Sequence, residues 1–96
     1  MAEVVFRRAA LRDLEGIVAR IAIDDPNAAE RFRKRILTRI AILHTLPESA
    51  RPRPEFGVGI RTIPIGRYIV FVRVAVPKVT VLHHSRSARS PASDEA

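Results

Sequence analysis

The sequence predicts an α+β domain, in which an antiparallel helical hairpin packs on a small antiparallel sheet of three to four strands. In the first half of the 96-residue chain, apolar residues recur at helical spacing. In the second half, the side-chain pattern has a period of two, as in β-strands. A proline-rich connector at residues 47–57 separates the halves. The length indicates one domain, which we expect over residues 1–89, with residues 90–96 as a flexible polar tail.

Two helices account for the first half. The first begins near Ala9, and its apolar positions lie three or four residues apart: Leu11, Leu14, Ile17, Val18 and Ile21. A second begins after Asp25, a favourable N-cap, with Pro26 as its first residue, and runs to about Leu46. Because a few residues join them, the helices must lie antiparallel. Gly16, inside the first helix, is a position where a second helix can approach closely.

Strands account for the second half, together with a short apolar edge strand near the N-terminus. They are expected at residues 4–6, 60–63, 68–74 and 79–84, with turns at 64–67 and 75–78. The strand that begins at Tyr68 is apolar on both faces, although a sheet with helices on one face usually shows polar residues on the other. Either loops or the N-terminal strand region cover that second face, or a partner chain does.

The charge balance indicates an anionic partner. The chain holds 17 Lys and Arg against 10 Asp and Glu, a net charge of +7, and only Lys34 and Lys78 are lysines. Arginine suits bidentate contact with phosphate or carboxylate. A high-GC genome would explain the ratio of arginine to lysine, but it would not explain the net charge. Nucleic acid or an acidic protein is therefore the expected partner.

Several classes of site are excluded by composition and spacing. Without cysteine, the chain has no disulfide and no cysteine-based zinc site. His83 and His84 are adjacent on a strand, so they point to opposite faces and do not share a metal. A Gly-rich phosphate loop and a GxSxG elbow are also missing. We expect no metal, no cofactor, no membrane span and no secretory signal, and therefore a cytoplasmic protein.

A metal-free ribonuclease is the enzymatic alternative, because such chemistry needs an acid, a base and cations around the phosphate. Four arginines can supply the cations and three other side chains the acid or base: Arg61, Arg67, Arg73 and Arg86, then Tyr68, His83 and His84. Their spacing does not require this role. Tyrosine in an apolar strand is usually part of a core, and arginines beside strands are usually solvated or paired.

The order and spacing of these segments resemble ParE toxins of the RelE/ParE superfamily over about residues 4–89. The most specific part is residues 57–74, with a G-x-G-x-R segment, a P-x-G-R-Y turn and an apolar strand that ends in Arg73 and Val74. The resemblance implies a RelE/ParE-like fold and the toxin of a type II toxin–antitoxin pair, a system associated with plasmid stabilisation. It implies a ParD-like antitoxin as partner, DNA gyrase as target, and operator DNA contacted only through the antitoxin.

The antitoxin is expected to dock on the apolar sheet face, steered by the positive charge of the toxin. The residues assigned to this contact are Arg61, Tyr68, Ile69, Phe71 and Arg73, bordered by Leu14, Val18 and Ile21 of the first helix. An ordinary core role is the competing interpretation for the three helix residues. Arg67, Arg86 and Arg89 are the candidates for target binding, and no residue is assigned to catalysis.

The chain also departs from the family pattern. Arg7 and Arg8 stand where the first helix often opens with Ser-Pro, so its N-cap is missing, and Arg86 stands where a histidine is common. The second change leaves the target open. The RelE branch cleaves mRNA in the ribosome, and this activity remains an alternative. A small basic nucleic-acid-binding domain is a further alternative, but it would need exposed aromatics, and the five aromatics here lie mostly at core positions.

Overall fold

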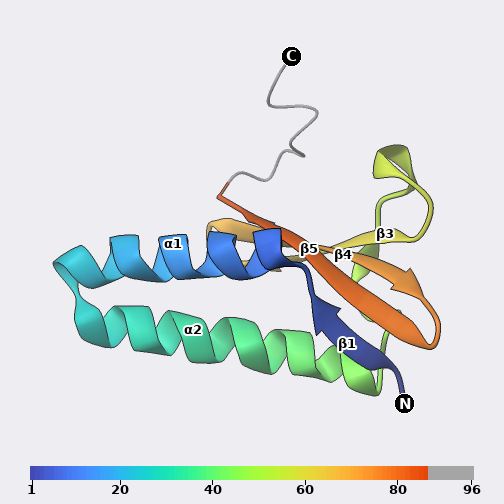
Figure 1. Ribbon diagram of the computed structural model, residues 1–96, viewed down its shortest axis with the longest axis horizontal. Helices are drawn as coiled ribbons and strands as arrows, with labels where there is room; N and C mark the ends of the chain where they lie inside the picture. Colours follow the sequence, from blue (N-terminus) through green and yellow to red (C-terminus); the bar gives the residue numbers. More distant parts are fainter. Residues whose placement is uncertain (87–96) are drawn as a thin grey trace.

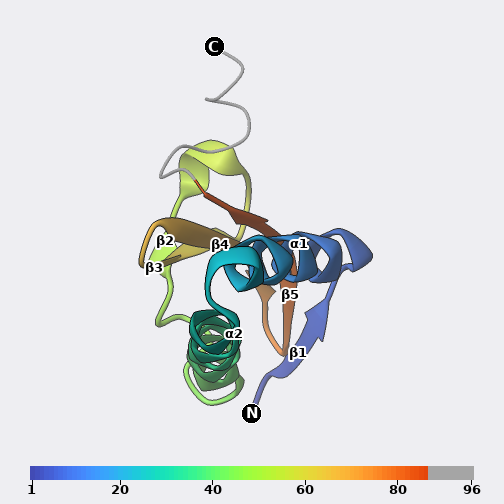
Figure 2. The same ribbon diagram turned by 90° about the vertical axis from the view of Figure 1, so that its left-hand side faces the viewer.

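A five-stranded mixed sheet with two helices packed on one face forms the described part of the chain, residues 1–86 (Figure 1). The elements in chain order are β1 (Glu3–Phe6), α1 (Arg8–Asp24), α2 (Pro26–Ala41), a 3-10 turn η1 (Ile42–His44), β2 (Arg51–Pro52), a 3-10 turn η2 (Pro54–Phe56), β3 (Ile60–Ile65), β4 (Tyr68–Ala75) and β5 (Lys78–Ser85). The hairpin of α1 and α2 is seen end-on in Figure 2. The expected tail at 90–96 and the domain end at residue 89 lie outside the described residues.

The α+β class is confirmed, but the expected purely antiparallel sheet of three to four strands is wrong. The strand order is β1-β5-β4-β3-β2, and β1 pairs in parallel with β5, from Glu3 opposite Lys78 to Phe6 opposite Val81. The hydrophobic run of β1 indicates a strand but not its direction. The fifth strand is the two-residue β2, which pairs antiparallel with β3 from within the proline-rich connector. Proline is tolerated there because β2 is an edge strand.

The helix ends follow the expected capping chemistry only in part. Asp25 caps α2 as predicted, since its Oδ1 accepts a hydrogen bond from the Ala28 amide at 3.1 Å, and Pro26 is the first helical residue. Arg7 makes no side-chain cap bond for α1, which agrees with the missing N-cap. The α-helix α2 stops at Ala41, earlier than the predicted Leu46, and the chain continues as the 3-10 turn η1.

The main core lies between the helices and the sheet. The helices contribute Ala10, Leu14, Val18, Ala29, Ile36 and Ile40, and the sheet contributes Ile63, Ile65, Val70, Val72, Val79 and Val81. All of these side chains are at most 6% exposed. The alternation predicted along β4 therefore places Val70 and Val72 under the helices.

A second, smaller cluster lies on the opposite face of the sheet. Its buried members are Ile60, Phe71 and Leu82, with Phe56 and Ile69 packed against them. Phe56 belongs to η2, and its ring centroid lies 5.9 Å from that of Phe71. Of the two explanations that the sequence left open for this face, coverage by a loop is thus correct for part of it.

A β-bulge changes the direction of the side chains at the end of β5. Val72 of β4 lies opposite Val81, but Phe71 lies opposite His83, so Leu82 is the extra residue. After the bulge His84 faces Val70 and turns toward the helices. Simple alternation had placed His84 with Thr80 and Leu82 on the other face, and that expectation is wrong because one inserted residue reverses every later position.

Two glycines have opposite surroundings, and this yields a stability prediction. A Cβ at Gly16 would meet no atom within 4 Å, so the expected close approach of a second helix does not occur there. Gly59 has a φ of 75°, and a Cβ would lie 2.8 Å from the carbonyl oxygen of Val74. Gly16→Ala should raise the free energy of unfolding by about 0.5–1 kcal/mol, because alanine favours the helix.

The Gly59→Ala variant should instead lower the free energy of unfolding by more than about 1–2 kcal/mol, because of its left-handed backbone and the contact with Val74. Urea denaturation of the two variants and the parent chain measures both effects. Equal stability of Gly59→Ala and the parent would contradict this description of the residue 57–59 loop.

Candidate functional site

A groove lies where α1 crosses the start of β4 and the end of β5. Its volume is about 420 Å³, and its lining residues are Arg12, Asp13, Gly16, Ile17, Arg20, Tyr68, His84 and Arg86. The five residues from α1 fall at positions that share one face of the helix. Three segments that are distant in the sequence thus bring polar side chains to one place.

Asp13 connects this face of α1 to the sheet. Its Oδ2 accepts a hydrogen bond from the backbone amide of His84 at 3.1 Å, and it lies 3.3 Å from Nδ1 of His83. The partner strand β1 ends at Phe6, opposite Val81, so the amide of His84 has no strand beside it there. The carboxylate of Asp13 takes the place of that strand and satisfies a donor that would otherwise remain unpaired.

His84 is buried at the bottom of the groove. Its side chain is 6% exposed, and both ring nitrogens are buried and lack a hydrogen bond of normal geometry, although the backbone of Ala10 lies close enough to interact with the ring. Burial lowers the pKa of His84, and the negative charge of Asp13 and the backbone of Ala10 oppose this effect. The imidazole is therefore neutral near pH 7. Buried polar atoms without a well-formed hydrogen bond are uncommon in folded proteins.

The charged side chains of the groove are unbalanced. Arg12, Arg20 and Arg86 are exposed, and within residues 1–86 none of them forms an ion pair or side-chain hydrogen bond. Among the described residues that line the groove, Asp13 is the only acid, so against the three arginines these residues carry an excess of two positive charges. The groove is thus a candidate site for an anion.

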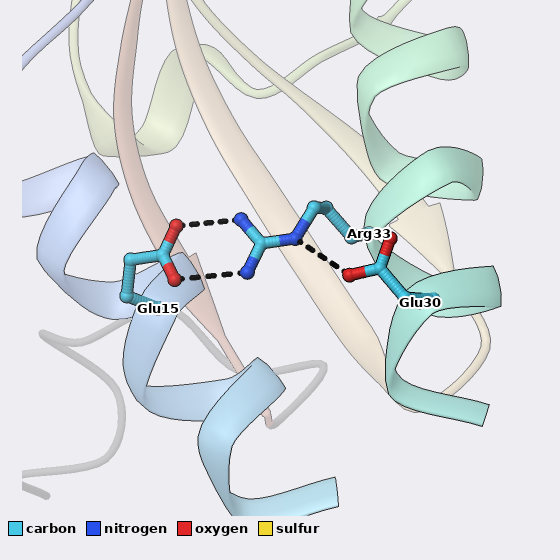
Figure 3. A network of polar contacts seen from close by, with 3 residues as sticks. All are labelled: Glu15, Glu30 and Arg33. Carbon is cyan, nitrogen blue, oxygen red and sulfur yellow. Dashed lines mark hydrogen bonds and ion pairs between the residues drawn. The ribbon is translucent and has the colours of Figure 1, made fainter. Parts of the chain in front are cut away.

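One arginine elsewhere on the hairpin is paired. Arg33 of α2 forms two hydrogen bonds with the carboxylate of Glu15 on α1, at 2.6 and 3.0 Å, and its Nε lies 3.4 Å from Glu30 (Figure 3). The hydrogen bond from Arg33 lowers the pKa of Glu15. This fork links the two helices.

The sheet residues assigned to antitoxin binding do not share one face. Arg61 lies opposite Val72 and Arg73 opposite Ile60, so these two arginines point to opposite sides of the sheet. The guanidinium of Arg61 donates to the carbonyl oxygens of Glu48 at 3.0 Å and Ala50 at 2.9 Å, which fixes the proline-rich connector.

On the second face Arg73 lies in the same β4 strand as the apolar residues Ile69 and Phe71. The Nε of Arg73 contacts the carbonyl oxygen of Val58 at 3.4 Å. Tyr68 lies on the helix-covered side, where its ring packs edge-on against Phe32 at 5.1 Å. The second face therefore carries three of the five assigned sheet residues.

The remaining assigned residues are dispersed. Leu14 and Val18 are buried in the main core, and Ile21 is half-buried against it. Arg67 is exposed in the turn between β3 and β4, and Arg86 lines the groove. Arg89 lies outside the described residues. Structural roles thus account for the burial of Leu14 and Val18.

Sequence reasoning missed Arg12, Asp13, Gly16 and Arg20 as parts of a site. A signal for them exists, because residues 12, 16 and 20 are spaced by four and form one stripe along α1. The bulge that brings His84 to this stripe has no comparable signal. Within residues 1–86, no helix is long and apolar enough to cross a membrane. Nor do the described residues include a group of three or more His, Asp or Glu suited to a metal.

The burial of neutral His84 predicts a pH dependence of stability. Below the ordinary histidine pKa of 6.5, the unfolded chain takes up a proton at this position before the folded chain does. The free energy of unfolding should therefore fall as the pH falls through 6.5 toward the lowered pKa. The slope contributed by one proton is at most about 1.4 kcal/mol per pH unit.

Urea denaturation at a series of pH values measures this slope. His84→Gln should remove the contribution of His84 to this slope, whatever the substitution does to the free energy of unfolding itself. The same slope in both proteins would show that His84 titrates normally in the folded chain.

Comparisons with known proteins agree with this architecture. A family model described as "ParE toxin of type II toxin-antitoxin system, parDE" matches residues 4–88. A solved structure described as "Chromosomal ParDE TA system from P. aeruginosa" is similar, with a TM-score of 0.77 and 21% identity over 91% of this chain and 97% of that chain. No curated protein sequence matches the chain. Since the family model covers nearly the whole sequence, the chain belongs to the ParE toxin family of type II toxin–antitoxin systems.

Proposed function

We propose that this toxin stops growth by binding and poisoning DNA gyrase, and that a ParD-like antitoxin neutralises it by folding over the second face of the sheet. The observation that carries the antitoxin part is the apolar cluster on that face. Phe71 and Leu82 are already covered there, in part by Phe56 of η2, so the surface left for a partner includes the half-buried Ile69 and the exposed Arg73. An apolar surface with a charged border suits a segment that docks through alternate side chains.

The charge of the chain supports an acidic antitoxin segment. Seventeen cationic residues against ten acidic residues give +7, which accelerates association with a negatively charged partner. In such a complex the antitoxin contacts operator DNA, and the toxin is linked to the DNA only through the antitoxin. Both gyrase and such a partner place the protein in the cytoplasm.

Binding without catalysis is supported by the distribution of the arginines proposed for phosphate chemistry. Arg61 is held by the connector carbonyls, Arg73 lies on the opposite face, and Arg67 lies at a turn. These three cations do not meet around one point. Dispersed charges of this kind suit a surface that binds a target better than they suit an active site, whose groups must converge on one point.

A second candidate function has one specific observation in its favour. Tyr68, His84 and Arg86, three of the seven side chains considered for a metal-free ribonuclease, do meet in the groove. The arginines there suit a phosphate and the Tyr68 hydroxyl suits an acid, whereas the ring nitrogens of His84 are buried beneath the groove. RelE-like endoribonuclease activity on mRNA therefore remains the alternative.

Induction of the toxin without its antitoxin separates the two functions. The gyrase proposal predicts growth arrest with filamentation and DNA breaks, while full-length mRNA persists. Co-expression of the antitoxin is the control and should restore growth. Rapid loss of full-length mRNA with an undamaged chromosome would favour the ribonuclease and overturn the gyrase proposal.

The docking surface is tested by two variants with the same loss of charge. Arg73→Ala on the second face should weaken antitoxin binding by about tenfold, as expected for a charged residue at an interface. Arg67→Ala, at the turn, should change that affinity little. Calorimetric titration with the antitoxin measures both, and an unaltered melting temperature confirms that each variant is folded. Equal affinities of Arg73→Ala and the parent toxin would refute the assignment of Arg73.

A further inference from the structure

We propose that the groove between α1 and the adjoining ends of β4 and β5 binds a phosphate group, carried by a nucleotide or by the end of a nucleic acid strand. This site is separate from the sheet face assigned to the antitoxin, because Tyr68 and His84 lie on the helix-covered side. Its ligand would be a small anion and not a protein surface.

The first argument is the arrangement of charge. Arg12 and Arg20 come from α1 and Arg86 follows β5, so guanidinium groups approach the groove from two sides. A carboxylate has two oxygens and is satisfied by a single arginine fork, whereas a phosphate has enough oxygens for several. Asp13 does not neutralise these arginines, because within residues 1–86 it is the one negative charge lining the groove against three positive charges.

The second argument is the position of His84 beneath the groove. Its side chain is only 6% exposed, and both ring nitrogens are buried without a hydrogen bond of good geometry to a described residue. The ring therefore forms part of the floor of the groove, and a phosphate held by the arginines above it would change its surroundings without bonding to it. The hydrogen bond between the His84 amide and Asp13 holds the backbone from which this ring projects.

The third argument is the shape of the site. A volume of about 420 Å³ falls in the range of small-molecule sites. Gly16 leaves space on the α1 side, since a Cβ there would meet no atom within 4 Å. Tyr68 and Ile17 give the groove an aromatic and an apolar wall. These walls suit the sugar and base that accompany the phosphate of a nucleotide.

Nuclear magnetic resonance of the histidine rings provides the test. Sodium phosphate, added at constant ionic strength, should shift the ring signals of His84 with a saturating curve. The ring of His44, which contacts the carbonyl oxygen of Ala2 in another part of the fold, serves as an internal reference and should not move. Sodium acetate should give a much weaker response. The proposal is overturned if the His84 signals do not move, or if acetate acts as strongly as phosphate.

Charge-matched variants separate this groove from general attraction to a basic protein. Arg12→Gln and Arg20→Gln should each raise the Kd for phosphate by about fivefold to tenfold. Arg31→Gln and Arg35→Gln, on exposed positions of α2, remove the same charge away from the groove and should change the Kd little. Equal losses in both pairs would mean diffuse charge attraction and would refute a defined site.

A steric variant tests the same groove without a change of charge. Gly16→Leu should fill the space beside α1 and weaken phosphate binding, whereas Gly16→Ala should leave it nearly unaltered. Circular dichroism verifies that both variants are folded. Unchanged binding by a folded Gly16→Leu protein would contradict the assignment.

Binding of three ligands shows which kind of molecule carries the phosphate group: a nucleotide, a 5′-phosphorylated oligonucleotide and its unphosphorylated counterpart. If a free nucleotide is the ligand, adenosine monophosphate should bind more tightly than inorganic phosphate. If a strand end is the ligand, a short 5′-phosphorylated oligonucleotide should bind more tightly still, and its unphosphorylated counterpart should lose that advantage. A phosphorylated oligonucleotide that binds no better than the unphosphorylated one, together with no response to the nucleotide, would overturn the proposal. None of these readouts depends on gyrase or on the antitoxin, so failure here is distinct from failure of the proposed function.

Discussion

The hydrogen bond from the His84 amide to the Asp13 carboxylate is the contact on which the rest of the site depends. It lies where β1 has ended and the edge of β5 would otherwise expose an unpaired donor. The carboxylate replaces a missing strand, and it does so from a helix, so it also fixes α1 against the end of the sheet. The main core already packs α1 on the sheet, and this link adds a polar contact at the point where the face with Arg12 and Arg20 meets the end of β5.

The bulge opposite Phe71 determines which side of the sheet the His84 side chain faces. It reverses the alternation of β5, so that Leu82 remains with the apolar cluster on the second face while His84 turns toward α1. One inserted residue thus separates two surfaces. The second face is apolar and suits a peptide-like partner, whereas the groove is cationic and suits a small anion. Surfaces of such different chemistry would allow the proposed antitoxin and the proposed phosphate ligand to bind separately.

The sequence predicts this fold well where periodicity is strong. Helical spacing predicts both helices, the Asp25-Pro26 pair correctly predicts the start of α2, and the period of two predicts β3, β4 and β5. The direction of β1 and the short β2 were missed, because a terminal apolar run carries no information on its partner and two residues show no period. For the candidate site, Tyr68, His84 and Arg86 were singled out. The groove itself was not, because Leu82 in the bulge looks like any other strand residue.

Amide hydrogen exchange at His84 tests the contact between α1 and β5 most directly. The amide should exchange slowly in the parent chain, and Asp13→Ala should accelerate its exchange much more than that of the central β4 amides. Asp13→Asn keeps an oxygen acceptor and should retain most of the protection. If Asp13→Ala leaves the exchange of the His84 amide unchanged, the carboxylate does not hold the end of the sheet, and the structural basis of the groove would be wrong.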